Sequence, residues 1–326
     1  MSNYILELEN AVVHGGHKVT KQEALELYKS DPAQTLFAAA DRIRKSCCSM
    51  RSNICSIINA KQGNCSENCS YCAQSSLWNT SCKTTGMIEP KQAAELCKKA
   101  VQNKVSRISL VTSGRCLSGT DFETALECLR HMQEQCGNSI SLCASFGIIS
   151  ADKLKRLKEA GVTRYHHNLE TGKNYYPKIC TTHTYSQRMQ TIKNAQACGL
   201  ELCCGGIIGL GESREDRIDL ANEIRELNVQ SVPINVLTPI PGTPLENAVQ
   251  ISKEEILRTI AVFRFIMPSQ TIRCAAGRKK LGDNGREAFL SGANALISGD
   301  FLTTSGSSNE DDRIMLKSLG YETEAL

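Results

Sequence analysis

The sequence has no long hydrophobic run and no pattern of an export signal. Its 326 residues contain no stretch that approaches the roughly 18 apolar residues needed to cross a membrane. The first residues also lack a basic segment followed by an apolar one, which is how secretory signals begin. We therefore expect a cytoplasmic protein that has no membrane partner.

Blocks of like charge are also absent. Lys and Arg number 38 against 34 Asp and Glu, which gives a net charge of +4, and the two signs are interspersed. Proteins that bind nucleic acid usually gather their basic residues in a patch or a stripe, so we expect no nucleic-acid partner. Apolar residues make up 41% of the chain, which is enough for a full core.

Cysteine, by contrast, is abundant. There are 17 cysteines, an odd number. Disulfide scaffolds belong to oxidising compartments and mostly to short chains, so metal ligands, reactive thiols and small buried side chains are favoured here. Cys97, Cys128 and Cys198 lie in stretches of helical period and are expected to pack in the core. So many thiols would be oxidised in air, which indicates an anaerobic source.

Short β-branched or apolar runs alternate with longer segments of helical period, without a low-complexity linker or a repeat. Helices are expected at residues 90–103, which has Pro in the first turn, at 214–228, and at 253–267, which Pro268 stops. The expected strands are residues 54–60, 107–113, 139–145, 163–170, 201–209, 231–237, 271–277 and 295–301.

Eight strands, each followed by a helix, predict an α/β protein with a closed (β/α)8 barrel of the TIM type. An open α/β sheet is the alternative, and the count of eight favours closure. We expect a single domain over residues 1–326, with a helical cap at 1–50, the barrel at 51–305, and a C-terminal helix and tail at 306–326. In such a barrel the chemistry lies at the carboxyl ends of the strands.

Cys65, Cys69 and Cys72 form a CxxxCxxC pattern in the loop after the first expected strand. Three thiolates at this spacing can hold three irons of a [4Fe–4S] cluster and leave the fourth iron open to the amino and carboxylate groups of a substrate. Zinc sites need four ligands and usually pair CxxC with a second pair of Cys or His, and none follows nearby. The pattern therefore favours an iron–sulfur cluster.

Three further cysteines, Cys55, Cys143 and Cys203, lie in the first, third and fifth expected strands. Strand residues alternate between faces, and in 139–145 the face that carries Cys143 is otherwise serine, as suits a barrel lumen. Taken singly, each of these thiols is more commonly a small buried residue. Taken together, near a first cluster, they favour a second iron–sulfur cluster.

Several longer motifs resemble one family. In chain order they are SIINAKQGNCSENCSYCAQS, YHHNLETG, ICTTHTYSQR, CCGGIIGLGES, SVPINVL, GTPLE and IRCAAGR. They cover nearly the whole chain, from about Cys55 to Tyr321, and are similar to the biotin synthase family of radical S-adenosylmethionine (SAM) enzymes. The resemblance implies sulfur insertion into dethiobiotin, with SAM on the [4Fe–4S] cluster and sulfur from an auxiliary cluster. It also implies reduced flavodoxin or ferredoxin as electron donor, and a homodimer.

The resemblance further implies which residues bind SAM. Tyr71 and Ile207 would lie near the adenine, Asn168 and Glu170 would contact the ribose, and Arg188 would pair with the SAM carboxylate. Glu170 stands where the family usually has Asp, so its reach is one methylene longer. Beyond the cluster ligands, no catalytic side chain is expected.

Three residues are implied to contact dethiobiotin. Asn235 would form hydrogen bonds with the ureido ring, and His166, which replaces an Asn of the family, would lie beside the substrate together with Asn168. The glycine-rich run at 205–211 does not open the helix of a first βα unit, so a dinucleotide-binding site is rejected.

The auxiliary site departs from the family pattern, in which three Cys and one Arg hold a [2Fe–2S] cluster. The matching positions are Ser109, Cys143, Cys203 and Arg273, and Cys55 stands where the family tends to have Ser. A hydroxyl is a poor ligand for iron–sulfur clusters. We therefore expect Cys55, Cys143 and Cys203, with Arg273 beside them, to hold a four-iron cluster that carries an extra sulfide. The alternative is a [2Fe–2S] cluster held by the same thiols plus Arg273 or Ser109.

Cys204 and Cys274 could substitute as ligands, but alternation turns them away if Cys203 and Arg273 face the lumen. Two other functions stay open. A radical SAM enzyme of the hydrogenase-maturase or methylornithine-synthase type shares the barrel and the CxxxCxxC pattern, and YHHNLETG together with PINVL argues against it. A non-catalytic iron–sulfur electron carrier would not need the polar residues at the strand ends.

Overall fold

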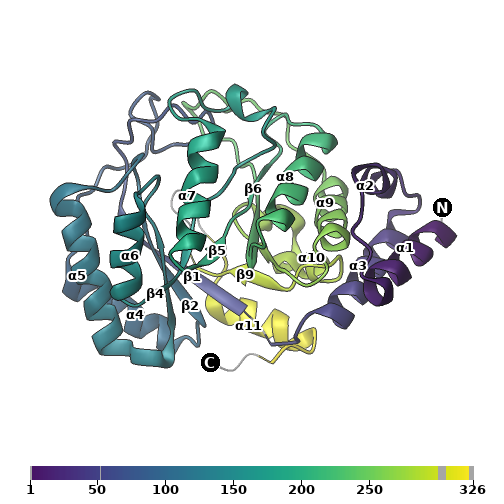
Figure 1. Cartoon of the computed structure of the whole chain (residues 1–326), viewed down its shortest axis with the longest axis horizontal. Helices are drawn as coiled ribbons and strands as arrows, with labels where there is room; N and C mark the ends of the chain where they lie inside the picture. The colour runs from purple at the N-terminus through teal and green to yellow at the C-terminus, as the bar shows by residue number, and fades with distance from the viewer. Residues whose placement is uncertain (1, 52, 300–305, 323–326) are drawn as a thin grey trace.

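Parallel strands and the helices that connect them make up most of the chain (Figure 1). This computed structural model describes residues 2–51, 53–299 and 306–322. The strands are β1 (Asn53–Lys61), β2 (Arg107–Thr112), β3 (Ser141–Ser145), β4 (Val162–His166), β5 (Glu201–Cys203), β6 (Gly206–Ile208), β7 (Ser231–Val236), β8 (Thr271–Cys274) and β9 (Ala295–Ile297).

The strands form one closed parallel sheet. Each pairs with the next along the chain, except that β5 does not pair with β6; both β5 and β6 pair with β7, and β9 returns to β1. The pieces β5 and β6 therefore occupy one strand position, and the barrel has eight positions. The predicted (β/α)8 barrel is confirmed.

Helices surround the barrel, as Figure 1 shows. They are α4 (Pro90–Gln102), α5 (Gly119–Cys136), α6 (Ala151–Glu159), α7 (Tyr185–Ala197), α8 (Arg214–Glu226), α9 (Lys253–Ile266), α10 (Arg286–Phe289) and α11 (Asn309–Ser318), with short 3₁₀ helices at Gly137–Ser139, Tyr176–Lys178, Arg278–Leu281 and Asp283–Gly285. The helices expected at 90–103, 214–228 and 253–267 are therefore confirmed.

Three helices precede the barrel, as predicted for the N-terminal region. They are α1 (Ser2–Gly15), α2 (Lys21–Tyr28) and α3 (Ala33–Cys47). The side chain of Thr20 accepts a hydrogen bond from the backbone of Glu23, and the Glu23 carboxylate accepts one from the backbone of Thr20, so a capping box starts α2. Helices α2 and α3 pack against α9, and this contact fixes the N-terminal helices to one side of the barrel (Figure 1).

Several strands are shorter than expected. The strand expected at 163–170 ends at His166, and residue 170 has a φ of 72°, which strands do not adopt. The one expected at 271–277 ends at Cys274, and the one expected at 295–301 ends at Ile297, with residues 300 and 301 outside the described residues. The strand expected at 201–209 is interrupted at Gly205, where the backbone lies very close to the backbone of an adjacent strand.

Two glycines make that interruption possible. A Cβ on Gly205 would lie 1.9 Å from the carbonyl oxygen of Pro233, and a Cβ on Gly206 would lie 2.4 Å from that of Glu170. Any side chain here would push β5 and β6 away from the adjacent strands. The segment can pass between the backbone at Pro233 and the backbone at Glu170 because these two glycines have no Cβ.

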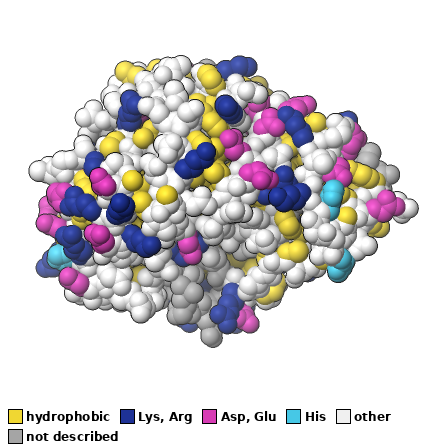
Figure 2. Space-filling view, viewed as in Figure 1, with side chains coloured by type: hydrophobic (Ala, Val, Ile, Leu, Met, Phe, Trp, Pro, Cys, Tyr) yellow, Lys and Arg dark blue, Asp and Glu magenta, His cyan; other side chains and the backbone are white. Residues whose placement is uncertain are grey.

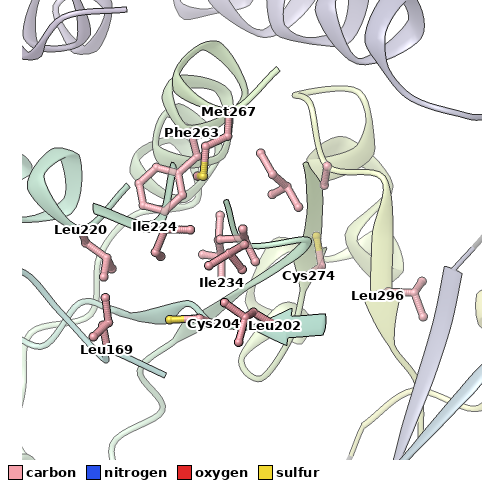
Figure 3. Packing of buried hydrophobic residues seen from close by; sticks show 14 of the residues in the cluster. Leu169, Leu202, Cys204, Leu220, Ile224, Ile234, Phe263, Met267, Cys274 and Leu296 are labelled. Carbon is pink, nitrogen blue, oxygen red and sulfur yellow. The ribbon is translucent and has the colours of Figure 1, made fainter. Parts of the chain in front are cut away.

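The apolar layer between strands and helices contains the cysteines that were expected to face away from the lumen. Cys204 and Cys274 are buried among residues such as Ile224 and Phe263 (Figure 3). Cys97 and Cys128 are fully buried in the same layer, and Cys198 packs against it. These positions agree with the outward orientation predicted for Cys204 and Cys274 and with the packing role predicted for the other three.

The surface shows no concentrated charge on the face drawn in Figure 2, where basic and acidic side chains are interspersed. Within the described residues, no helix is both long and apolar enough to span a membrane.

Candidate active site

A cavity of about 350 Å³ lies at the carboxyl ends of the strands, where barrel enzymes hold their substrates. Every residue predicted to bind SAM or substrate lines it, together with one of the predicted cluster cysteines. These residues are Tyr71, Cys72, His166, Asn168, Glu170, Arg188, Ile207 and Asn235. The sequence motifs, which are spread over more than 160 positions, therefore converge on one site.

The loop that carries Cys65, Cys69 and Cys72 is held by its own backbone. The amide of Cys65 donates to the carbonyl of Gln74 at 2.9 Å, and that of Cys72 donates to the carbonyl of Cys69 at 3.0 Å. Burial raises the pKa of the Cys72 thiol to about 11, and the charges of Cys65 and other neighbours add to the effect. Cys72 therefore lies near enough to Cys65 and Cys69 for their charges to interact, and its thiol needs a metal to be deprotonated near neutral pH.

A second loop, which contains Thr181, Thr182 and His183, holds the cysteine loop in place. No role was predicted for this loop from the sequence. The Glu67 carboxylate accepts a hydrogen bond from Thr182 at 2.8 Å and lies 2.5 Å from Nδ1 of His183. The side-chain oxygen of Asn68 accepts hydrogen bonds from the backbone amides of Thr181 and Thr182. The side chains of Glu67 and His183 are 6% and 4% exposed, so the clamp is buried.

Cys180 lies beside the cluster loop and was also missed. The ligand atoms of Cys69, Cys180 and His183 all lie within 4.8 Å of one another. The contact between the two thiols raises the pKa of Cys69 and lowers that of Cys180. The motif ICTTHTYSQR contains both Cys180 and His183, but nothing in its spacing indicates contact with residues more than 100 positions earlier.

Arg188 is buried at the edge of the cavity and is held from three sides. Its Nε donates to the hydroxyl of Tyr176 at 2.8 Å, and its Nη1 donates to the carbonyl of Asn168 at 2.9 Å and lies 3.3 Å from the Glu170 carboxylate. Burial alone would lower the pKa of Arg188, but the Glu170 carboxylate and nearby anionic groups raise it well above its ordinary value. The guanidinium is therefore a fixed positive charge.

Asn168 and Glu170 are positioned by the segment that follows β5. The amide of Gly205 donates to Oδ1 of Asn168 at 3.1 Å, and the carbonyl of Glu170 accepts from the amide of Ile207 at 2.7 Å. The two side chains also approach each other, with Nδ2 of Asn168 3.4 Å from the Glu170 carboxylate. Together they present a carboxylate and an amide to the cavity.

Asn235 has backbone partners on both sides of its amide. Its Nδ2 donates to the carbonyl of Gly206, and its Oδ1 accepts from the amide of Ala276, both at 3.1 Å. These bonds fix the orientation of the side chain and leave one N–H for a ligand. Nearby, Nε2 of His167 is buried and has no hydrogen-bond partner among the described residues. A polar ligand in the cavity would satisfy it.

The lumen below the cavity contains the thiols predicted for a second cluster. Cys55 and Cys143 are 9% and 3% exposed. Burial raises the pKa of both thiols. The charge of Cys203 raises both pKa values further, and the charge of Cys55 also raises that of Cys143. Burial would also raise the pKa of Cys203, but His166 and nearby arginines lower it to about 6. The predicted convergence of these strands brings the three thiols into one electrostatic group.

Ser109 and Arg273 also lie where the sequence analysis expected them. Ser109 is in register with Cys143 on the adjacent strand, and its buried hydroxyl has no hydrogen-bond partner among the described residues. Arg273 is 1% exposed, and its Nη1 and Nη2 donate to the backbone carbonyl and side-chain oxygen of Asn53 at 2.7 and 2.8 Å. The guanidinium is therefore braced by the first residue of β1.

Two further arginines surround the lumen thiols, and the sequence analysis did not identify them. Arg107 donates from Nη1 to the sulfur of Cys143 at 3.6 Å, and Arg164 pairs with Glu201 at 2.7 Å. The charges of both lower the pKa values of the lumen thiols, in opposition to burial. Three thiols, three guanidinium groups and one unpaired hydroxyl fit an anionic iron–sulfur cluster.

Comparisons with known proteins agree along the whole chain. Residues 60–224 match the radical SAM superfamily, and residues 233–322 match the Biotin and Thiamin Synthesis associated domain. The biotin synthase of Clostridium tetani is 48% identical over 327 residues, which covers 99% of this chain and 100% of that protein. The biotin synthase of Acetivibrio thermocellus is 47% identical over 98% of this chain and 99% of that protein.

Solved structures of lower identity share the fold. Methylornithine synthase (PylB) superposes with a TM-score of 0.82 at 19% identity and covers 97% of this chain and 96% of its own. HydG, a maturase of the [FeFe]-hydrogenase, superposes with a TM-score of 0.82 at 16% identity and covers 98% of this chain and 75% of its own. At these identities the likeness is one of barrel architecture.

Proposed function

The chain belongs to the biotin synthases of the radical SAM superfamily, and we propose from this how its own residues share the work of inserting sulfur into dethiobiotin. One observation carries the proposal. Three lumen thiols from three strands are near enough for their charges to affect one another, in the barrel beneath a cavity lined by the residues expected to bind SAM. A sulfur donor and a substrate radical need such proximity.

Cys65, Cys69 and Cys72 hold the [4Fe–4S] cluster in this proposal. When bound there, the cluster and SAM supply the radical chemistry that removes hydrogen from dethiobiotin. The chain contributes the geometry: the buried Glu67–His183 contact keeps the cysteine loop against the mouth of the barrel. That clamp also keeps water away from one side of the loop.

SAM is held in the cavity by its charged and polar groups. Arg188 binds the SAM carboxylate through Nη2, because Tyr176, Asn168 and Glu170 already engage its Nε and Nη1 and hold the guanidinium in place. Asn168 and Glu170 bind the ribose hydroxyls, and Tyr71 and Ile207 contact the adenine. His166, Asn168 and Asn235 bind dethiobiotin on the lumen side of the cavity. The remaining amide N–H of Asn235 suits the ureido carbonyl.

Cys55, Cys143 and Cys203 hold the auxiliary cluster, with Arg273 beside it. Three thiolates leave a four-iron cluster one ligand short, and an extra sulfide would complete it and be the atom transferred to the substrate. Ser109 is not a ligand in this proposal: its unpaired hydroxyl donates a hydrogen bond to the cluster instead. The alternative is a [2Fe–2S] cluster held by the same thiols plus Arg273 or Ser109.

Two further proposals rest on the family. The electron donor is reduced flavodoxin or ferredoxin, and the enzyme is a homodimer in which residues 1–326 act as one unit. Mixing with each reduced donor and measuring SAM cleavage tests the first, and sedimentation tests the second.

The deciding experiment compares Cys55→Ser with Ser109→Ala under anaerobic conditions. Total iron, 5′-deoxyadenosine and biotin are measured in each, with a low-potential reductant, SAM and dethiobiotin. We expect Cys55→Ser to lose the auxiliary iron and biotin formation while it still cleaves SAM, because the radical site is separate. Ser109→Ala should keep both clusters.

Two results would contradict these assignments. If Ser109→Ala loses the auxiliary iron and Cys55→Ser does not, the cluster uses the family's usual strand position. If the wild-type protein with both clusters intact cleaves SAM but yields no sulfur-containing product, the roles given to the lumen residues are wrong.

A further inference from the structure

Cys180 and His183 have no place in the ligand set proposed for the radical cluster, although both lie against it. The ligand atoms of Cys69, Cys180 and His183 lie within 4.8 Å of one another. Among the described residues, no other group of three or more Cys, His, Asp or Glu side chains is as compact. The three residues are only 8%, 4% and 5% exposed, so bulk water competes little for an ion bound between them.

The spacing of these atoms suits a single tetrahedral metal ion. Zinc bonds of about 2.3 Å to sulfur and about 2.0 Å to nitrogen place two sulfurs about 3.8 Å apart, and a sulfur and a nitrogen about 3.5 Å apart. The Cys180 sulfur lies 3.3 Å from Nδ1 and 3.9 Å from Nε2 of His183. Within the described part of the chain, Cys65, Cys69 and Cys72 do not form a group this compact, as suits a larger cluster.

His183 is oriented as metal-binding histidines are. Its Nδ1 lies 2.5 Å from the buried carboxylate of Glu67. A carboxylate accepts a hydrogen bond from Nδ1–H, which leaves the lone pair of a neutral imidazole on Nε2. Among the described residues, the only hydrogen-bond partner of Nε2 is the Cys180 sulfur, at 3.9 Å. Carboxylates hold the imidazoles of zinc sites in the same way.

The chemistry of these groups selects a soft divalent cation. Thiolates and imidazole suit zinc, whereas Mg²⁺ and Ca²⁺ prefer oxygen ligands. Two thiolates neutralise the charge of the ion, so the positive charge of Arg188, which acts on Cys69, does not oppose its binding. His183 also lines the cavity of about 350 Å³, which offers an ion a way in and room for a fourth ligand.

We propose that Cys69, Cys180 and His183 form a zinc site of the iron-free chain, with water from the cavity as the fourth ligand. Zinc displaces one proton from each thiol, and no electrons are transferred. The zinc ion and the radical cluster exclude each other because both need the Cys69 thiolate, and this consequence rests on the proposed function. A chain with zinc at this site cannot cleave SAM until the ion leaves.

The zinc affinity of the reduced, iron-free full-length chain tests the site. Competition with a chelator measures the Kd of the first equivalent of Zn²⁺ in wild type, Cys180→Ser, Cys65→Ser and Cys143→Ser. We expect Cys180→Ser to weaken binding at least about tenfold, since even changes outside the ligand shell cost that much. The other two variants remove a cysteine of the loop and one of the lumen, and they should bind zinc like the wild type. A comparable loss in either of them, or none in Cys180→Ser, overturns the proposal.

A measurement on the wild-type chain needs no variant to fold. X-ray absorption at the zinc edge, with one equivalent of Zn²⁺ on the iron-free chain, counts the ligands by type. We expect two sulfurs and one imidazole nitrogen. Three or four sulfurs without imidazole would place the ion on the cysteine loop or in the lumen, and the assignment to Cys180 and His183 would be wrong.

Reassembly of the radical cluster tests the exclusion. Iron-free chains with and without one equivalent of Zn²⁺ receive Fe²⁺ and sulfide anaerobically, and the recovery of 5′-deoxyadenosine formation is followed. Zinc should slow recovery about tenfold in the wild type, because the ion has to dissociate first, and should not slow it in Cys180→Ser. Equal rates in the wild type contradict the exclusion. If the zinc-free wild type never cleaves SAM, the proposed function fails instead, while the zinc affinities still decide the metal site.

Discussion

At the scale of single residues, close backbone contacts decide where the groups proposed to bind SAM lie. Gly205 and Gly206 pass within contact of Pro233 and Glu170, and the same passage delivers the Gly205 amide to Asn168. Glu170 adopts a φ of 72° at this point, so its carboxylate leaves the line of β4 and approaches Arg188. A side chain at either glycine would disturb all of these contacts.

Gly205→Ala should therefore destabilise the protein by about 1–3 kcal/mol, as forced overpacking does. It should also weaken SAM binding, because Asn168 would lose its hydrogen bond from the Gly205 amide. Denaturant unfolding and equilibrium dialysis with SAM measure the two effects. Gly86→Ala is the matched control, since a Cβ there meets no atom within 4 Å. Equal stability of the two variants would show that the contact at Pro233 relaxes without cost.

Residues whose roles depend on spacing along the chain could be predicted, and those whose roles depend on distant contacts could not. Cys65, Cys69 and Cys72 are apparent because one loop carries all three. By contrast, Cys180 and His183 meet Cys69 across more than 100 residues, and no periodicity connects such positions. The motif ICTTHTYSQR contains both residues, but nothing in it indicates this contact.

At the scale of elements, α8 and α9 are joined by a partly buried network of charged side chains. Glu255 of α9 accepts hydrogen bonds from Arg214 at 2.6 Å and from Arg217 at 2.8 Å, both on α8. Arg217 also reaches Glu212 at 2.6 Å, in the segment that follows β6. Burial would raise the pKa of Glu255, but the two arginines outweigh it and lower that pKa. The network fixes two helices beside the fifth strand position.

Glu255→Gln should destabilise the protein by about 2 kcal/mol at neutral pH, since charged hydrogen bonds are lost. The pKa of Glu255 is lower in the folded chain than in the unfolded one. Its stabilisation is therefore complete above about pH 4.3 and lost as the pH falls through the folded value. The difference in the free energy of unfolding between wild type and variant should therefore shrink below that pH. Denaturant unfolding of the iron-free proteins at several pH values measures it.

Glu254→Gln is the control for this network. Glu254 is on the same helix and pairs with Arg258, but its side chain is 60% exposed. Exposed ion pairs contribute less than about 1 kcal/mol, so this variant should unfold like the wild type. A pH-independent loss of stability in Glu255→Gln would mean that packing of the side chain, and not its charge, holds α8 to α9.

The elements themselves were predictable in number and order, but not in all their ends. Alternating periods gave the eight strand positions. The split between β5 and β6 follows from the close contacts of Gly205 with Pro233 of β7 and of Gly206 with Glu170, which lies beyond the end of β4. A single sequence contains no signal for such contacts, because they depend on how the strands close into a barrel.

At the scale of the whole molecule, two cavities and the lumen between them follow one another along the barrel axis. The cavity at the carboxyl ends is lined by the residues proposed to bind SAM, the thiols proposed to hold the auxiliary cluster lie within the lumen, and a second cavity, lined in part by Cys48, lies at the amino ends. The lumen positions could be foreseen from strand alternation alone. The second cavity could not, because it combines the end of α3 with the starts of strands that are distant in sequence.

This arrangement implies that the radical site can be removed without unfolding the barrel. Cys69→Ala should lose the iron of one cluster and all SAM cleavage, while it keeps the auxiliary iron. The loop should stay in place, because Trp78 donates to the backbone carbonyl of Cys69, and the Glu67–His183 clamp does not involve that side chain. Iron content, 5′-deoxyadenosine and the melting temperature of the iron-free forms are measured, with Cys116→Ala as the control. Iron-free forms are compared because a bound cluster itself stabilises the folded state. Wild-type rates of 5′-deoxyadenosine formation in Cys69→Ala would remove Cys69 from the ligand set. A large fall in its melting temperature would show instead that the thiol contacts with Cys180 hold the loop to the barrel.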